Sequence, residues 1–220
     1  PHQQTQVVPI AGGNLEKLFD FLHIVDKDER LLLSVYLVSC FIPDIPHPIP
    51  VIHGPMGSGK SSVHKMLRRL IDPSELELLA LPNDVGNLVM ILDHHWAPIF
   101  DNIDNIKPWQ SDALCRAVTG EGVSKRSLYT NDDAFIYSYR RCVGLNGINP
   151  CATRPDLLDR SILIELDRIP DDKQWTEADL WERFEEARPG ILGSIFDVLS
   201  RAVPEYPNLV LQGLPRMADF

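Results

Sequence analysis

The sequence predicts an α/β fold in which helices flank a parallel sheet, with helices before the sheet and a helical lid after it. Short apolar segments typical of strands alternate with segments of helical period over residues 45–170. One of those strands runs through a glycine-rich loop directly into a helix, and only helical patterns follow residue 175. We therefore divide the chain into an N-terminal helical segment (1–44), a core (45–170) and a helical lid (171–220), which we expect to be truncated.

The composition is typical of a globular protein with one domain, or with one domain and a small satellite. The chain has 220 residues, of which 44% are hydrophobic and 24% are charged. Its longest apolar run, from Leu31 to Ile42, is shorter than the about 20 residues that a membrane span needs. The N-terminus lacks the charged and apolar regions of a signal peptide. We expect a cytoplasmic protein without a membrane partner.

The net charge limits how the chain could bind nucleic acid. A value of −10 argues against sequence-independent binding over the whole surface, although a small basic element could still act on DNA. The chain lacks an initiator Met and stops abruptly after Phe220. We therefore expect a fragment of a longer protein.

Two helices and a linker are expected before the core. The first helix covers 14–24 with Asn14 as its N-cap, because apolar residues recur there at i, i+3, i+4 and i+7. The second, more apolar helix covers about 28–41. The prolines of "IPDIPHPIP" then exclude helix, because each lacks an amide donor and restricts the residue before it. A short strand follows at about 49–53.

The first half of the core contains two clear helical patterns. After the glycine-rich loop, a helix at 60–71 carries apolar residues on one face, and "DPSE" ends it. A short strand could form at 76–81. A second helix begins at Asp84 or Asn83, a strand follows within 96–104, and the next helix is expected to be capped by Ser111.

The second half of the core begins with a hairpin. Two β-rich runs, 123–129 and 134–140, flank the turn "TNDD". Two further strands are expected in 141–148 and 160–169. From Trp175 onward we expect two helices with a break at Pro189–Gly190, because proline interrupts a helix and glycine weakens it.

The glycine-rich loop carries the strongest chemical signal. Residues 54–61 fit G-x-x-x-x-G-K-[ST], in which glycines let backbone amides turn inward around phosphates. The amides and the helix N-terminus that follows form an anion site. Lys60 would place its charge on the phosphates of ATP or ADP, and the Ser61 hydroxyl would hold Mg²⁺. The expected binding residues are Gly54, Pro55, Met56, Gly57, Ser58, Gly59, Lys60, Ser61 and Ser62.

A phosphate loop of this kind needs a second acidic residue at the end of a neighbouring strand. Asp93 and Asp101 both follow apolar runs, but the run before Asp93 has helical period. We therefore prefer Asp101 as the Mg²⁺ residue and interpret Asp93 as a surface acid at a helix end. His94 and His95 are interpreted as a polar helix end rather than as metal ligands.

Hydrolysis also needs a group that orients or deprotonates the attacking water. Asn102 follows Asp101, and an amide can position water but cannot accept its proton. Asp104 is the nearest spare carboxylate. Either the base lies elsewhere or turnover is slow, and the sequence leaves both open.

The cysteines give no metal or disulfide signature. No CxxC pair and no metal-ligand spacing with histidine is present, so we interpret all four as buried reduced thiols. They are Cys40, Cys115, Cys142 and Cys151.

The order of these motifs resembles the AAA+ ATPase module of phage and mobile-element primase–helicase proteins. The resemblance rests on "GPMGSGKSS", "IFDNID", "GLNGI", "TRPDLLDRSI" and "PRMADF", and it extends from about 14 to 220. Superfamily III and minichromosome-maintenance helicases are wider relatives, with a hairpin inserted before sensor 1. The resemblance implies a P-loop AAA+ fold.

The resemblance also implies roles for individual residues. Lys60 and Ser61 would belong to Walker A, Asp101 to Walker B, and Asn146 to sensor 1, although Asn-Gly is also a turn signal. The implied arginines are Arg160 as the finger that reaches a neighbouring subunit's nucleotide, Arg154 as a second candidate, and Arg216 as sensor 2. Arg154 and Arg160 could instead be solvated partners of Asp156 and Asp159. Asn102 departs from the Glu of many relatives, which leaves catalytic competence open.

In such motors the hairpin faces a central channel. Lys125 and Arg126 could bind phosphates there, and interleaved tyrosines could stack on bases. Those tyrosines are Tyr129, Tyr137 and Tyr139. Because the turn is acidic, an ordinary solvated hairpin is an equal alternative.

These observations predict an ATP-hydrolysing AAA+ motor that assembles into a homo-oligomeric ring, suspected to be a hexamer. It would act as a helicase or translocase on single-stranded or forked DNA during mobile-element replication. The alternative is a nucleotide-dependent switch or assembly ATPase with weak hydrolysis, which Asn102 favours. A small-molecule kinase is disfavoured, because the arginine segment and helical lid would have no role there.

Overall fold

A computed structural model describes the protein over most of its length. The described residues are 2–121, 123–126, 134–137, 139–170 and 174–208, with backbone only for 123–126 and 134–137. A four-stranded parallel sheet forms the centre, in the order β2-β5-β1-β6. Its strands are β1 (Ile49–His53), β2 (Ile99–Phe100), β5 (Gly144–Gly147) and β6 (Ser161–Glu165). The predicted α/β class with a helix-flanked parallel sheet is confirmed.

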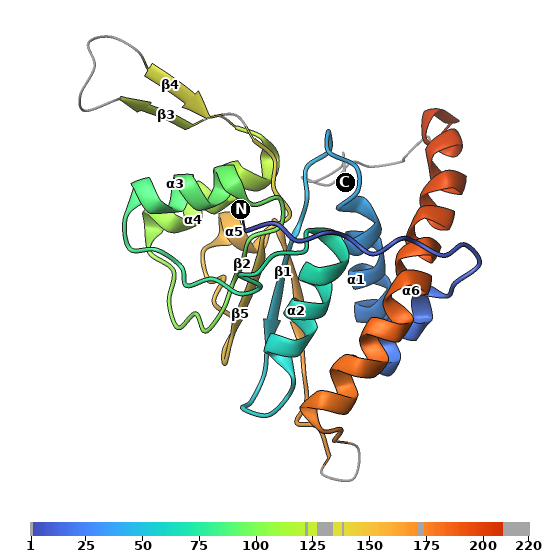
Figure 1. The fold of residues 1–220 in the computed structure, drawn as a ribbon. Coiled ribbons are helices and arrows are strands. Elements are labelled where there is room, and N and C mark those ends of the chain that lie inside the picture. Colours follow the sequence, from blue (N-terminus) through green and yellow to red (C-terminus); the bar gives the residue numbers. More distant parts are fainter. Residues whose placement is uncertain (1, 122, 127–133, 138, 171–173, 209–220) are drawn as a thin grey trace.

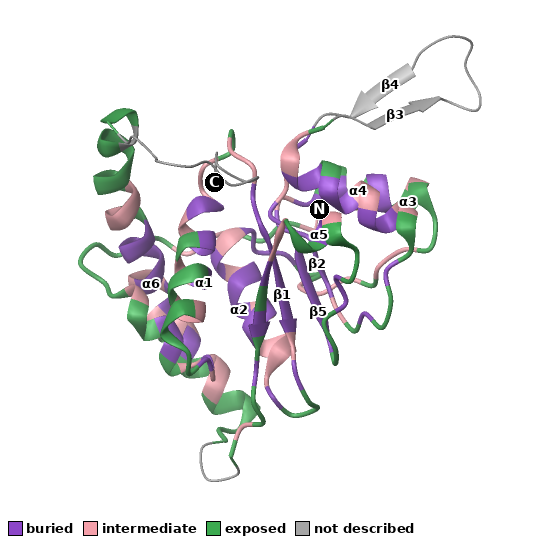
Figure 2. Ribbon diagram, turned by 180° about the vertical axis from the view of Figure 1, so that it is seen from behind, coloured by how far each residue is buried: buried purple, intermediate pink, exposed green. Residues whose placement is uncertain are grey.

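Helices cover both faces of this sheet (Figures 1 and 2). One face packs on η1 (Leu15–Asp20), α1 (Lys27–Ser39), α2 (Lys60–Ile71) and α6 (Glu177–Glu205). The other packs on α3 (Val85–His94), α4 (Pro108–Thr119) and the short α5 (Pro155–Leu158). Because side chains alternate along a strand, Ile52 of β1 lies in the first core and its neighbour Val51 in the second.

The first predicted helix is a 3₁₀-helix, so the expectation of an amphipathic α-helix over 14–24 is wrong in type. Its bonds run from i to i+3, as between the Lys17 amide and the Asn14 carbonyl. This short helix is enough to bury Leu18 and Phe19, whose spacing suits either helix type. The predicted cap is confirmed, because the Asn14 side chain accepts a hydrogen bond from the Glu16 amide.

The predicted break in the last helix is also wrong, because α6 continues through Pro189. The N-terminal segment crosses α6 here, and the Ile10 amide donates to the Pro189 carbonyl at 2.9 Å. A Cβ on Gly193 would lie 1.9 Å from the Ile10 carbonyl oxygen, so glycine permits this close crossing. Packing on both sides therefore stabilises a helix that proline and glycine alone would weaken.

Two other elements differ from expectation. The possible strand at 76–81 is only an isolated parallel bridge between Leu79 and Phe100. Helix α4 begins at Pro108 rather than after Ser111, and the Gln110 side chain accepts from the Lys107 amide at 2.7 Å. Proline suits the first helical position, because the amide it lacks would have had no partner there.

The predicted hairpin is confirmed as β3 (Val123–Arg126) paired antiparallel with β4 (Ala134–Tyr137). Its turn lies outside the described residues. The three-part division of the chain stays a prediction, and one buried cluster includes side chains from all three parts. Among the described residues, no helix is both long and apolar enough to cross a membrane.

Candidate functional site

The candidate site lies at the carboxyl edge of the sheet. The strands are parallel, so the segments that follow them meet at one edge. The 54–59 loop follows β1, Asp101 follows β2, and Leu166 follows β6. Three segments that are far apart in the sequence therefore meet around the loop, which joins β1 to α2 as predicted (Figure 1).

Gly54 and Gly59 occupy loop positions where the backbone conformation or a close contact favours glycine. A Cβ on Gly54 would lie 2.2 Å from the Leu166 carbonyl oxygen, so the loop closely approaches the segment after β6. Gly59 is left-handed, with φ +83°, and is the N-cap of α2 without a side-chain cap. The amides of the first turn of α2 therefore have no capping side chain, which leaves them available to an anion.

The Lys60 side chain folds back over this loop. Its Nζ donates to the carbonyl oxygens of Gly54 at 2.8 Å and Pro55 at 2.7 Å. Burial lowers the pKa of Lys60, and the carboxylate of Asp101 acts in the opposite direction. The ammonium group therefore lies within the loop and in the field of Asp101.

Ser61 and Asp101, the two predicted Mg²⁺ residues, are brought together. The Ser61 hydroxyl lies 3.3 Å from Asp101 Oδ2, and Asp101 Oδ1 accepts from the Asn102 amide at 2.9 Å. A hydroxyl beside a carboxylate matches the hard oxygen ligands that Mg²⁺ prefers.

The competing candidates lie elsewhere. Asp93 is exposed in the last turn of α3, as expected for a surface acid, and His94 is exposed beside it. His95 is not part of a polar helix end: it is buried, and its Nδ1 lies 2.7 Å from Arg68 Nη2.

Asn146 and Asn102 differ in their surroundings. Asn146 is only 2% exposed in β5, opposite Ile52 of β1, and its Nδ2 has no hydrogen-bond partner among the described residues. A buried amide without a partner costs free energy unless a ligand satisfies it. Asn102 is exposed and left-handed, with φ +55°, and Asp104 is exposed nearby. Asn146 is thus the buried donor, while Asn102 faces solvent.

The candidate arginines lie at the other end of β6. Arg160 immediately precedes Ser161, which pairs with Ile49, whereas the loop follows His53 at the far end of β1. Its guanidinium binds the carbonyl and carboxylate of Asp156, both at 2.8 Å. Arg154 is 44% exposed and pairs with Asp112 at 3.2 Å. The local pairing considered for Arg160 is therefore present, and neither arginine lies at the 54–61 loop of its own chain. Arg216 lies outside the described residues.

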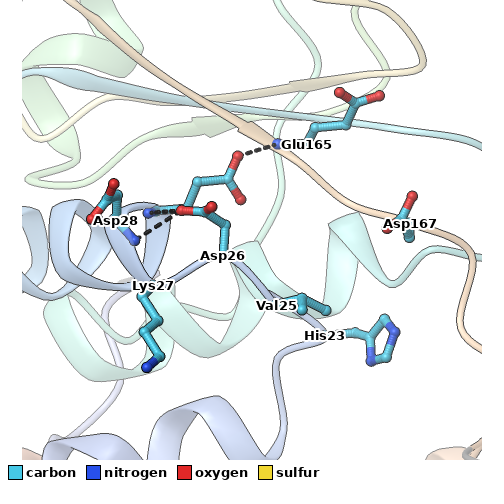
Figure 3. Close-up of a pocket in the computed structure, with 8 residues that line it drawn as sticks. His23, Val25, Asp26, Lys27, Asp28, Glu165 and Asp167 are labelled. Atoms are coloured by element: carbon cyan, nitrogen blue, oxygen red, sulfur yellow. Dashed lines mark hydrogen bonds between the residues drawn. The ribbon is translucent and has the colours of Figure 1, made fainter.

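A pocket of about 580 Å³ opens at the end of β6 (Figure 3). Two of its lining residues, Glu165 and Asp167, flank Leu166, whose carbonyl the loop approaches at Gly54. Its walls come from the segment before and at the start of α1 and from the end of β6, where the Glu165 amide donates to Glu29 at 3.3 Å. The lining residues are His23, Val25, Asp26, Lys27, Asp28, Glu29, Glu165 and Asp167. Sequence reasoning missed this pocket, because its two walls are more than a hundred residues apart and carry no motif.

The hairpin leaves the sheet at the opposite end from the loop (Figure 1). Tyr139 is 7% exposed and packs in the second core, with the Arg141 guanidinium 4.9 Å from its ring centre. The expectation that Tyr139 stacks on bases is therefore wrong, because its ring is already buried. Tyr129 lies outside the described residues.

The family model described as "Actinomycete integrative conjugative element replication protein" matches residues 15–220. The chain belongs to this family. No curated protein matches it.

Solved structures share the fold at low sequence identity. Two apo structures of the NrS-1 C-terminal region have TM-scores of 0.58, at 13% and 14% identity, and each match covers 85% of this chain. The chain spans only 46% of the length of those C-terminal-region chains. A JCV helicase structure has a TM-score of 0.48 at 11% identity, with 84% of this chain and 54% of that one covered, and is too distant to carry an argument. The likeness to NrS-1 extends to the fold alone.

Proposed function

We propose that the chain binds ATP with Mg²⁺ at the 54–61 loop and hydrolyses it as the AAA+ motor module of a mobile-element replication protein. The observation that carries this proposal is the meeting of Ser61 and Asp101 at 3.3 Å beside the Lys60 ammonium. These three groups come from the segments that follow β1 and β2, the two strands on either side of β5 in the parallel sheet.

The phosphates would be held by the backbone and by Lys60. The first amides of α2 point toward the loop, and their dipole favours an anion. Lys60 donates to two loop carbonyls, which carry only partial negative charge. A triphosphate would offer it a stronger acceptor, so we expect Lys60 to turn from these carbonyls to the phosphates.

The nucleoside would lie in the acidic pocket beside the loop. Its carboxylates repel phosphates but accept hydrogen bonds from ribose hydroxyls and from the amino group of a base. The two ends of the nucleotide are thus matched to a cationic loop and an acidic pocket.

Turnover would depend on the groups around the γ-phosphate. Asn146 Nδ2, which has no hydrogen-bond partner among the described residues, is suited to orient a phosphate oxygen or the attacking water. Asn102 can also orient water but cannot take its proton, and Asp104 is the nearest exposed carboxylate. Slow hydrolysis by a nucleotide-dependent switch is therefore the second candidate function, favoured by Asn102.

The position of the arginines supports assembly into a homo-oligomeric ring. Arg160 and Arg154 lie at the sheet end away from their own loop, so they could act on a phosphate only in a neighbouring subunit. We propose such a ring, which by its resemblance to AAA+ motors would be a hexamer. We also propose that it moves along DNA.

Nucleotide binding is tested by titrating the protein with a fluorescent ATP analogue and Mg²⁺. We expect Lys60→Ala to weaken binding at least about 10-fold, while Lys65→Ala on the same helix leaves it unchanged. Equal affinity in both variants and the unchanged protein would contradict the proposed phosphate site.

A further inference from the structure

Three side chains that are far apart in the sequence meet in the interior at the amino end of the sheet. Cys40 is the C-cap of α1, His47 lies in the proline-rich linker before β1, and Cys142 precedes β5. Their two sulfur atoms and an imidazole nitrogen all lie within 4.8 Å of one another. Each residue is at most 1% exposed.

His47 is the unusual member of this cluster. Both of its ring nitrogens are buried without a hydrogen-bond partner among the described residues. Burial, with a smaller contribution from Arg140, lowers its pKa to about 4, so the ring is neutral at pH 7. A neutral imidazole has a lone pair to donate, and leaving that nitrogen unsatisfied in the interior costs free energy. Within the described part of the chain, the geometry therefore leaves an imidazole nitrogen without a partner beside two thiols.

We propose that Cys40, His47 and Cys142 bind Zn²⁺ or a similarly thiophilic divalent cation. Two thiolates and one neutral imidazole balance the +2 charge of the ion, which suits a site without solvent. Tetrahedral ligands at the usual bond lengths are about 3.5–3.8 Å apart, so the three atoms must approach by roughly 1 Å at most. Each thiol gives up its proton to solvent as the metal binds.

Neighbouring groups already hold these ligands in place. Trp96 donates its indole N–H to the Cys40 carbonyl at 2.9 Å, and its ring packs edge-on against His47 at 5.7 Å. The Tyr36 hydroxyl donates to the Cys142 carbonyl at 3.3 Å and also interacts with the Cys40 thiol. Tyr36 therefore places a hydroxyl oxygen beside the two cysteines of the cluster. Fixed outer partners of this kind usually orient metal ligands.

The position of the cluster indicates a structural role. Cys142 lies on the segment that returns from the hairpin to β5, and the other two ligands lie at the end of α1 and in the linker. A bound ion would join these three segments at the base of the hairpin. It lies at the opposite end of the sheet from the 54–61 loop, so it is independent of the proposed nucleotide site.

The test measures metal content and its effect on the whole chain. The protein is purified without chelator, and zinc per protomer is determined by mass spectrometry. We expect about one zinc in the unchanged protein and in Cys115→Ser, a matched control at another buried cysteine. Cys142→Ser and His47→Ala should each lose at least nine-tenths of that zinc.

A second measurement uses the unchanged protein, so it tests the proposal even if a variant folds poorly. The unchanged protein is stripped by a chelator, and Zn²⁺ alone is added back while thermal unfolding is recorded. We expect Tm to fall on stripping and to return on addition of Zn²⁺, and Co²⁺ to produce a thiolate charge-transfer band. A stripped protein with unchanged Tm, no stoichiometric zinc before stripping and no such band would overturn the proposal, as would a Cys40–Cys142 disulfide in the purified protein.

Discussion

Asp101 and Asp93 are the clearest pair of alternatives at the scale of single residues. Both end apolar runs, yet one follows a buried strand and contacts Ser61, whereas the other is exposed on α3. The difference could be predicted, because the 3.6-residue period before Asp93 is that of a helix. What could not be predicted is the orphaned amide of Asn146, since hydrogen-bond satisfaction depends on neighbours from other elements.

The first prediction separates these two aspartates. Asp101→Asn removes the carboxylate proposed to hold the metal, so hydrolysis should fall by roughly three orders of magnitude. Asp93→Asn should leave the rate unchanged, because its side chain is exposed on a helix away from the loop. Steady-state ATP hydrolysis of both variants checks this. Similar losses in both would contradict the assignment.

The packing of α2 on the sheet gives a prediction at the scale of elements. His64 of α2 is fully buried, and a Cβ on Gly144 of β5 would lie 3.1 Å from its Nε2. Burial lowers its pKa to about 3, below the 6.5 expected in the unfolded chain. Above pH 6.5, His64 is neutral in both states and does not reduce the free energy of unfolding. That free energy falls as the pH decreases from 6.5 toward 3, because the unfolded chain then takes up a proton that folded His64 does not.

Denaturant titrations at several pH values measure this effect. At pH 5, protonation of His64 in the unfolded chain alone should cost about 2 kcal/mol relative to pH 7. His64→Leu should remove this part of the pH dependence, and other histidines would keep theirs. An unchanged slope of the unfolding free energy against pH in His64→Leu would contradict it.

Helix α6 gives a second prediction at this scale. Gly193→Ala would place a methyl group against the Ile10 carbonyl, so the N-terminal segment must shift. We expect a loss of about 1–3 kcal/mol in the free energy of unfolding. Glu186→Ala, at an exposed position of the same helix, should change it by less than about 0.5 kcal/mol. Denaturant unfolding checks both, and a stable Gly193→Ala would show that the crossing is looser than described.

At the scale of elements, the 49–71 unit could be predicted from the sequence and the continuous α6 could not. The strand–loop–helix unit at 49–71 was predicted to within a residue, because an apolar strand, glycines and an amphipathic helix agree locally. The continuous α6 was not predicted, because its stability at Pro189 comes from the crossing N-terminal segment. The cluster of Cys40, His47 and Cys142 was not predicted for the same reason, because its members meet only through the tertiary fold.

For the whole molecule, the two ends of the sheet carry different features. The 54–61 loop and the acidic pocket lie at the carboxyl end, whereas the hairpin, the candidate arginines and the cysteine–histidine cluster lie at the amino end. In the proposed ring, the amino end of one subunit would face the loop of the next. Arg160 would then exchange Asp156 for a phosphate in that neighbour.

Mixing two inactive variants tests this arrangement. Lys60→Ala lacks phosphate binding but keeps its arginines, and Arg160→Ala lacks the proposed finger but keeps its loop. Each alone should hydrolyse ATP at least about 100-fold more slowly, and mixed rings should regain part of the activity. Recovery with Arg154→Ala in place of Arg160→Ala would move the role to Arg154, and no recovery with either would contradict action between subunits.

The most direct test of the central claim is the rate of ATP hydrolysis measured against protein concentration, with and without single-stranded DNA. We predict a rate per protomer that rises with concentration, responds to DNA and is lost in Lys60→Ala and Arg160→Ala. Tight ATP binding with negligible turnover under every condition would contradict the motor and would favour a nucleotide-dependent switch, with Asn102 as the reason.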